Sequence, residues 1–137
     1  MIFCSNAGKI SVGVMSLEIL SVYAIGAGIY ALIELMWRGW THWTMLICGG
    51  ACFTFMYLIS AAALPLWAKC VICAAVISAV EFGTGYLVNI TLGWRVWDYS
   101  DRPFNIMGQI CPLYSFFWLL LSVPGLALCR ELRQLIA

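Results

Sequence analysis

One acid and three small or polar residues share a face of an otherwise apolar stretch. Ser78, Glu81, Gly85 and Asn89 follow one another at spacings of 3, 4 and 4 residues, so on a helix they form one stripe. A lipid-facing stripe would be apolar, and we therefore expect this one to face the protein interior. Such a stripe could line a path for a cation, a proton or a small polar solute. The alternative is a structural one, in which Glu81 is protonated or paired and only pins helices together.

A second acid, Glu34, lies near the end of an earlier apolar stretch. Arg38 follows four residues later, so a salt bridge at the membrane interface would explain this acid. A functional pairing of Glu34 with Glu81 is the other interpretation, and both remain open at this point. Glu18 lies about 24 Å back along the same helix. We expect it to snorkel towards the opposite interface.

A polar and aromatic link, residues 93–105, follows the stretch that contains Glu81. Its aromatic residues fit the belt that lies at headgroup depth in membrane proteins. Its acids, amide and arginine make it more polar than an anchor requires. We therefore expect a structured, re-entrant or lid-like segment that packs over the mouth of a helix bundle. The candidate binding or pathway residues are Glu81, Glu34, Asn89, Ser78, Trp97, Asp98, Tyr99 and Asn105.

The composition places these residues in a membrane protein. Of the 137 residues, 64% are hydrophobic and only 9% are charged. The mean hydropathy of +0.98 lies far outside the usual range of soluble proteins. The formal charge of +1 provides no basic surface for nucleic acid, so nucleic-acid binding is excluded.

The hydropathy pattern predicts one domain, residues 1–137, of four transmembrane helices. The expected spans cover residues 14–37, 43–64, 69–92 and 106–129. Pro65 marks a turn after the second span, because a proline just past a helix cannot continue it. We expect Pro112 and Pro124 to distort the fourth span. The N-terminal residues are too polar for a signal peptide, so the first span is expected to be retained.

The basic residues suggest an orientation in the cell membrane. Four lie on one side and three on the other: Lys9, Lys69, Arg130 and Arg133, against Arg38, Arg95 and Arg102. This bias predicts cytoplasmic termini and an external link at residues 93–105.

The two halves of the sequence resemble each other. In each half an acid is followed by a Trp-Arg-x-Trp motif, at residues 37–40 in the first half and 94–97 in the second, and then by a glycine-containing helix. Two spans per half would give a parallel two-helix repeat about the membrane normal. Chance similarity between apolar helices with interfacial tryptophans is the alternative.

The seven cysteines are scattered over the helical stretches. Cys48 and Cys52, and Cys70 and Cys73, are close enough on their helices to suggest metal or redox chemistry. With a single histidine in the chain, we interpret them instead as buried, reduced thiols. Glycine pairs at residues 26 and 28 and at 49 and 50 predict close helix packing. No catalytic, phosphate-binding, cofactor or metal motif is recognisable.

A set of motifs resembles one membrane family. The pattern runs from Glu81-x-x-x-Gly85 through Trp97-Asp-Tyr-Ser100 to Asn105-x-x-Gly108-x-Ile110, with Trp118 beyond. Gly28 and Glu34 also fit. These residues resemble the CmpB-like family of ABC-transporter type IV proteins, to which vertebrate transmembrane protein 229 is similar. The resemblance implies a multi-spanning membrane protein; any ATPase would be a separate subunit.

Three function classes follow. The leading hypothesis is a small transport or channel protein for a cation, a proton or a small polar solute, acting as a homo-oligomer (a dimer) in the lipid bilayer. The second is a membrane-embedded enzyme that acts on a lipid or amphipathic substrate, less favoured because no ligand set supports it. The third is a non-catalytic interaction or regulatory subunit.

Overall fold

The residues that the structure describes fold into four apolar helices. The computed structural model describes residues 3–137, with side chains from residue 13 onward. In chain order the elements are α1 (Phe3–Arg38), α2 (Trp43–Ser60), α3 (Leu66–Gly85), the π-helix η1 (Tyr86–Thr91) that continues α3, and α4 (Pro112–Ile136). Four stretches within them are long and apolar enough to cross a membrane. The prediction of an all-α protein with four membrane spans is confirmed.

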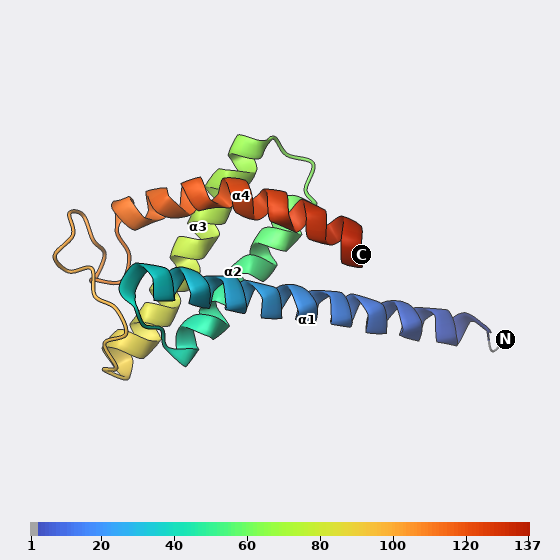
Figure 1. Ribbon diagram of the computed structural model, residues 1–137, viewed down its shortest axis with the longest axis horizontal. Helices are drawn as coiled ribbons and strands as arrows, with labels where there is room; N and C mark the ends of the chain where they lie inside the picture. The colour runs from blue at the N-terminus through green and yellow to red at the C-terminus, as the bar shows by residue number, and fades with distance from the viewer. Residues whose placement is uncertain (1–2) are drawn as a thin grey trace.

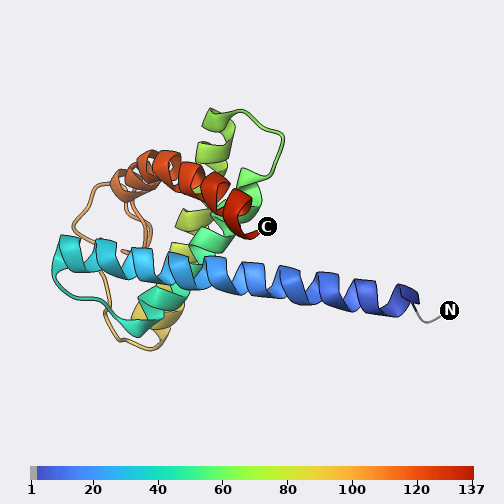
Figure 2. The ribbon, with the colours of Figure 1, turned by 45° about the vertical axis from the view of Figure 1, so that its right-hand side comes forward.

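The helices form two pairs, α1 with α4 and α2 with α3, and one pair crosses the other (Figures 1 and 2). In both views α2 and α3 cross α1 and α4 at a steep inclination. The N-terminal end of α1 and the C-terminal end of α4 lie on the same side, and the link between α3 and α4 lies on the other, near the C-terminal end of α1. The side chain of Lys9, used above to predict the orientation, lies outside the described side chains.

Glycines allow α1 and α2 to approach closely. A Cβ atom on Gly26 would lie 2.3 Å from Cβ of Phe53, and one on Gly49 would lie 2.3 Å from Cβ of Tyr30. Any larger residue at either position would push the helices apart. Gly28 differs, because a Cβ there would meet nothing within 4 Å. The predicted close packing is therefore confirmed at Gly26 and Gly49.

The core between the four helices contains thiols and hydroxyls. Val22, Tyr57, Cys73, Ser122 and Cys129 are the largest fully buried side chains. The six described cysteines are free and buried, as predicted. Among the described residues no group of three or more His, Cys, Asp or Glu side chains is placed to hold a metal ion.

The fourth helix begins later than predicted. Pro112 occupies its first turn instead of distorting a helix that began at residue 106. A proline fits this position because it has no N–H to contribute and its fixed φ suits a helix start. Residues 92–111, which we call the connector, are therefore longer than the polar link expected at 93–105. The helix also continues to Ile136, so the polar C-terminal stretch after residue 129 is helical.

The second span is shorter than predicted. α2 ends at Ser60, and residues 61–65 form the turn to α3, with Pro65 as the residue before the helix. Nζ of Lys69 donates a 2.8 Å hydrogen bond to the carbonyl oxygen of Ser60. This bond closes the turn by satisfying a carbonyl that the helix end leaves free.

Candidate functional site

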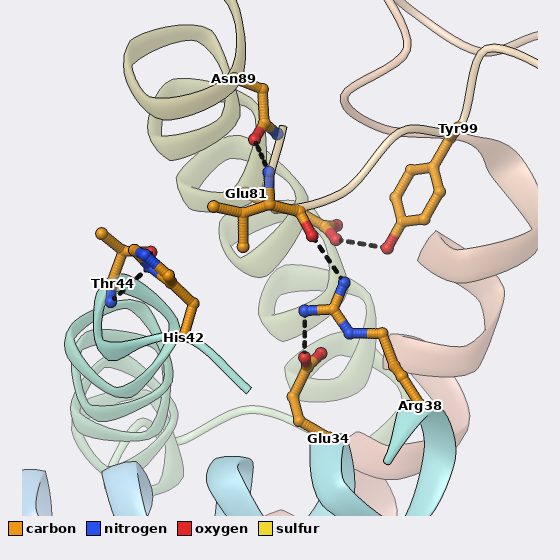
Figure 3. Close-up of polar contacts among 8 residues, drawn as sticks. Glu34, Arg38, His42, Thr44, Glu81, Asn89 and Tyr99 are labelled. Atoms are coloured by element: carbon orange, nitrogen blue, oxygen red, sulfur yellow. Dashed lines mark hydrogen bonds and ion pairs between the residues drawn. The ribbon is translucent and has the colours of Figure 1, made fainter. Parts of the chain in front are cut away.

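Glu81 lies at the centre of the site, buried with 4% of its surface exposed. Oε1 accepts a 3.0 Å hydrogen bond from the hydroxyl of Tyr99, and Oε2 accepts a 3.1 Å hydrogen bond from Nε1 of Trp118. Figure 3 shows the contact with Tyr99. The carboxyl therefore faces inward, as the stripe on α3 predicts, and joins α3 to the connector and to α4.

Tyr99 lies in the connector and acts as a neutral hydrogen-bond donor. Burial, together with the nearby charge of Glu81, raises the pKa of its hydroxyl well above the usual range. Its ring stacks on Tyr114 of α4, with centroids 4.5 Å apart. One side chain thus fixes the connector against two helices.

The rest of the predicted stripe also contacts partners inside the protein. Oγ of Ser78 lies 2.8 Å from Oγ of Ser115 on α4. A Cβ on Gly85 would lie 2.5 Å from Oε1 of Gln109 and 2.8 Å from Cζ2 of Trp97, so only glycine leaves room for the connector. The stripe is a contact surface for α4 and the connector.

Asn89, in η1, fixes the connector through both ends of its amide. Nδ2 donates a 2.8 Å hydrogen bond to Oε1 of Gln109, and Oδ1 accepts a 2.7 Å hydrogen bond from the backbone N–H of Val96. Trp97 is 7% exposed, and its Nε1 donates to the carbonyl oxygen of Gln109 at 3.0 Å. Trp97 is therefore packed inside the protein, where its indole N–H finds a partner, and its placement at headgroup depth stays a prediction.

The connector also contains hydrogen bonds between its own residues. Oδ1 of Asp98 accepts a 2.9 Å hydrogen bond from the backbone N–H of Ser100. Hydrogen bonds from Ser100 lower the pKa of the Asp98 carboxyl from its usual value. Oδ1 of Asn105 accepts a 2.9 Å bond from the N–H of Gly108, which has a φ of +72°. Asp98 and Asn105 therefore shape the connector.

Glu34 forms the salt bridge that its spacing from Arg38 predicts. Oε2 of Glu34 lies 2.5 Å from Nη2 of Arg38, and Nη1 of Arg38 donates a 2.8 Å bond to the carbonyl oxygen of Val96 (Figure 3). The guanidinium also lies 4.2 Å from the ring centroid of Trp40. The salt bridge is therefore confirmed, and the functional pairing of Glu34 with Glu81 stays a prediction.

A cavity of about 460 Å³ lies among α1, α4 and the connector. Of the predicted site residues it is lined by Glu34, Trp97 and Tyr99. Ser78, Glu81, Asn89, Asp98 and Asn105 do not line it. The remaining lining residues are Tyr30, Ile33, Trp37, Arg38, Met45, Tyr114, Phe117, Trp118, Leu120 and Leu121.

A second cavity, of about 280 Å³, continues the first between α1, α2 and α4. Both cavities are lined by Tyr30, Ile33, Trp118 and Leu121. The rings of Tyr30 and Trp118 stack with centroids 5.9 Å apart. We call this ring pair the Tyr30–Trp118 stack. Trp118, which donates a hydrogen bond to Glu81, thus forms part of the wall of both cavities.

A second polar cluster lies towards the chain ends. Glu18 accepts a hydrogen bond from the hydroxyl of Tyr57, and Nη2 of Arg133 donates a 2.6 Å bond to the carbonyl oxygen of Tyr57. The guanidinium of Arg133 lies 4.0 Å from the Tyr57 ring centroid. Glu18 therefore binds a neighbouring helix instead of snorkelling to the interface as expected.

Sequence reasoning missed the roles of Gln109, Tyr114 and Trp118. A signal for Trp118 exists, because Ser115, Trp118 and Ser122 are spaced by 3 and 4 residues and form a stripe on α4 that matches the one on α3. Ser115 meets Ser78 and Trp118 meets Glu81. Gln109 and Tyr114 have no such pattern.

Four apolar helices around a buried acid and two cavities define a multi-pass membrane protein of a kind consistent with transport. A family model described as "Putative ABC-transporter type IV" matches residues 1–135. The chain therefore belongs to this CmpB family, which the motifs around Glu81 predicted. No match is found among curated proteins or solved structures.

Proposed function

We propose that this protein is a small transport protein of the cell membrane that moves a proton, a cation or a small polar solute, with Glu81 as its ionisable group. The path runs along the two cavities between α1 and α4. The termini are cytoplasmic, and the connector covers the external end. Since four helices offer little interior space, the working unit is a homodimer.

The observation that carries this proposal is the double role of Trp118. Its indole N–H donates to Glu81, and its ring stacks on Tyr30 where both cavities share a wall. A change at Glu81 therefore acts on the part of the wall common to both cavities. An ionisable group inside a membrane is costly, and this arrangement gives it a use.

The coupling follows from hydrogen-bond chemistry. A carboxylate accepts from both Tyr99 and Trp118, whereas a protonated or cation-bound carboxyl has less accepting capacity. Loss of the bond to Trp118 frees the indole to leave the Tyr30–Trp118 stack. The equilibrium between separated and joined cavities then depends on whether the Glu81 carboxylate has bound a proton or a cation.

In this proposal Glu34 and Asn89 hold the connector in place. Arg38 links Glu34 to the backbone of Val96, and Asn89 links η1 to the same residue. Movement of the connector would have to break both links. Ser78, Asp98 and Asn105 stabilise the arrangement and do not face the path.

The experiment measures proton flux into liposomes that contain a trapped pH-sensitive dye. We expect Glu81→Gln to reduce flux at least tenfold relative to wild type, because the amide cannot take up a proton. Glu131→Gln is the matched control, since this acid is 60% exposed at the end of α4. Equal flux in wild type and Glu81→Gln would end the assignment of Glu81.

A structural role for Glu81 is the competing function, because both carboxyl oxygens already have donors inside the protein. Under that role Glu81→Gln would lower the melting temperature in detergent while flux per folded molecule stayed the same. Normalising flux to the folded fraction recovered by gel filtration separates the two.

A further inference from the structure

We propose that the larger cavity binds a lipophilic organic cation of single positive charge, and that such a cation is the transported solute. The inference names the substrate class of the proposed function and so rests on it. It is argued from the lining, the charge and the size of the cavity.

The lining consists mainly of aromatic rings. Seven of the thirteen lining residues are aromatic: Tyr30, Trp37, Trp97, Tyr99, Tyr114, Phe117 and Trp118. The face of an aromatic ring attracts a cation within about 6 Å of its centroid, most strongly where water is excluded. Rings on several sides of one cavity match the recognition of quaternary ammonium and similar ions.

The charges near the cavity favour a cation. Glu34 and Arg38 line it and neutralise each other at 2.5 Å. Glu81 lies directly behind the wall, where it accepts hydrogen bonds from Tyr99 and Trp118. While Glu81 is ionised, two carboxylates against one guanidinium leave one net negative charge. Hydrogen-bond chains polarise their members, so donation to Glu81 makes these two rings more electron-rich.

The same residues disfavour other ligands. An inorganic cation such as Ca²⁺ or Mg²⁺ needs several oxygen ligands, but Glu34 is the one carboxylate in the lining and is already paired with Arg38. An anionic amphiphile would need a free cation, but Arg38 already contacts Glu34 and the carbonyl oxygen of Val96. The volume of about 460 Å³ lies within the range of pockets for small organic ligands.

The test uses tetraphenylphosphonium and its isosteric anion tetraphenylborate, titrated into the purified protein in detergent. We expect the cation to bind at least tenfold more tightly than the anion, because shape and hydrophobic area are the same and only the charge differs. Equal affinities, or no binding of the cation, would overturn the inference.

Two tryptophans of similar exposure, one in the lining of the cavity and one outside it, serve to locate the binding site. Trp37 lines the cavity and is 68% exposed, whereas Trp67 is 72% exposed and lines neither cavity. We expect Trp37→Leu to weaken tetraphenylphosphonium binding about tenfold and Trp67→Leu to leave it unchanged. The same loss in both variants, or in neither, would contradict the site.

A second pair of variants protects the test against a folding defect. Tyr114→Leu removes a lining ring and Tyr114→Phe retains it, so only the first should weaken binding.

The flux measurement distinguishes failure of this inference from failure of the proposed function. Glu81-dependent proton flux without tetraphenylphosphonium binding overturns this inference alone, whereas binding with Glu81-independent flux overturns the proposed function.

Discussion

Oε2 of Glu81 accepts a 3.1 Å hydrogen bond from Nε1 of Trp118, which joins α3 to α4. The same indole ring stacks on Tyr30 of α1. An acid on α3 is therefore hydrogen-bonded to a ring of α4 that stacks on α1. In an apolar medium few other groups can compete for the acceptor.

Removal of the acceptor should destabilise the fold. We expect Glu81→Ala to lower the free energy of unfolding by about 2 kcal/mol, because it leaves the Tyr99 hydroxyl and the Trp118 N–H buried without an acceptor. Glu81→Gln retains an amide oxygen and should lose about half as much. Thermal unfolding in mild detergent measures both. Equal stability of wild type and Glu81→Ala would show that these hydrogen bonds contribute nothing net.

A methyl group on Gly85 should displace the connector. Its Cβ would lie 2.5 Å from Oε1 of Gln109 and 2.8 Å from Cζ2 of the buried Trp97. We expect Gly85→Ala to cost about 1–3 kcal/mol of stability, as overpacking does. Gly83→Ala, two residues earlier, meets nothing within 4 Å and is the control. A Gly85→Ala protein as stable as Gly83→Ala would disprove the close approach of the connector.

The order of the connector should depend on pH through Asp98. Hydrogen bonds from Ser100 hold the pKa of the carboxyl below its usual value of 3.8. The hydrogen bonds between Ser100 and the Asp98 carboxylate therefore contribute to the order of the connector above pH 3.8. This contribution is lost as the pH falls through the lowered pKa of Asp98.

The amide resonance of Ser100, followed by NMR in micelles, should titrate with a midpoint below 3.8. The corresponding transition should be absent in Asp98→Asn. A midpoint at or above the usual value would mean that the bond from Ser100 does not favour the charged form.

Much of the fold follows from the sequence because membrane helices are dictated by runs of apolar residues. The inward direction of Glu81 was predictable for the same reason, since Ser78, Gly85 and Asn89 lie on its face and lipid accepts no polar stripe. The Glu34–Arg38 salt bridge follows from a spacing of four residues.

The start of α4 was not predictable from hydropathy. Residues 106–111 are apolar enough to extend a span, yet they form a loop in which Ile106 and Ile110 are bridged. What decides against a helix is Pro112, which fits best at a helix start. The cavities were also hidden, because they depend on rings from three segments whose side-chain directions no spacing rule relates.

The most direct test of the coupling between Glu81 and Trp118 is a double-mutant cycle on proton flux in liposomes. It compares wild type, Glu81→Gln, Trp118→Phe and the double variant at equal folded protein. If Glu81 acts through Trp118, each single variant reduces flux and the double variant is no worse than the more severe single one. Effects that multiply in the double variant would show independent action and contradict the coupling.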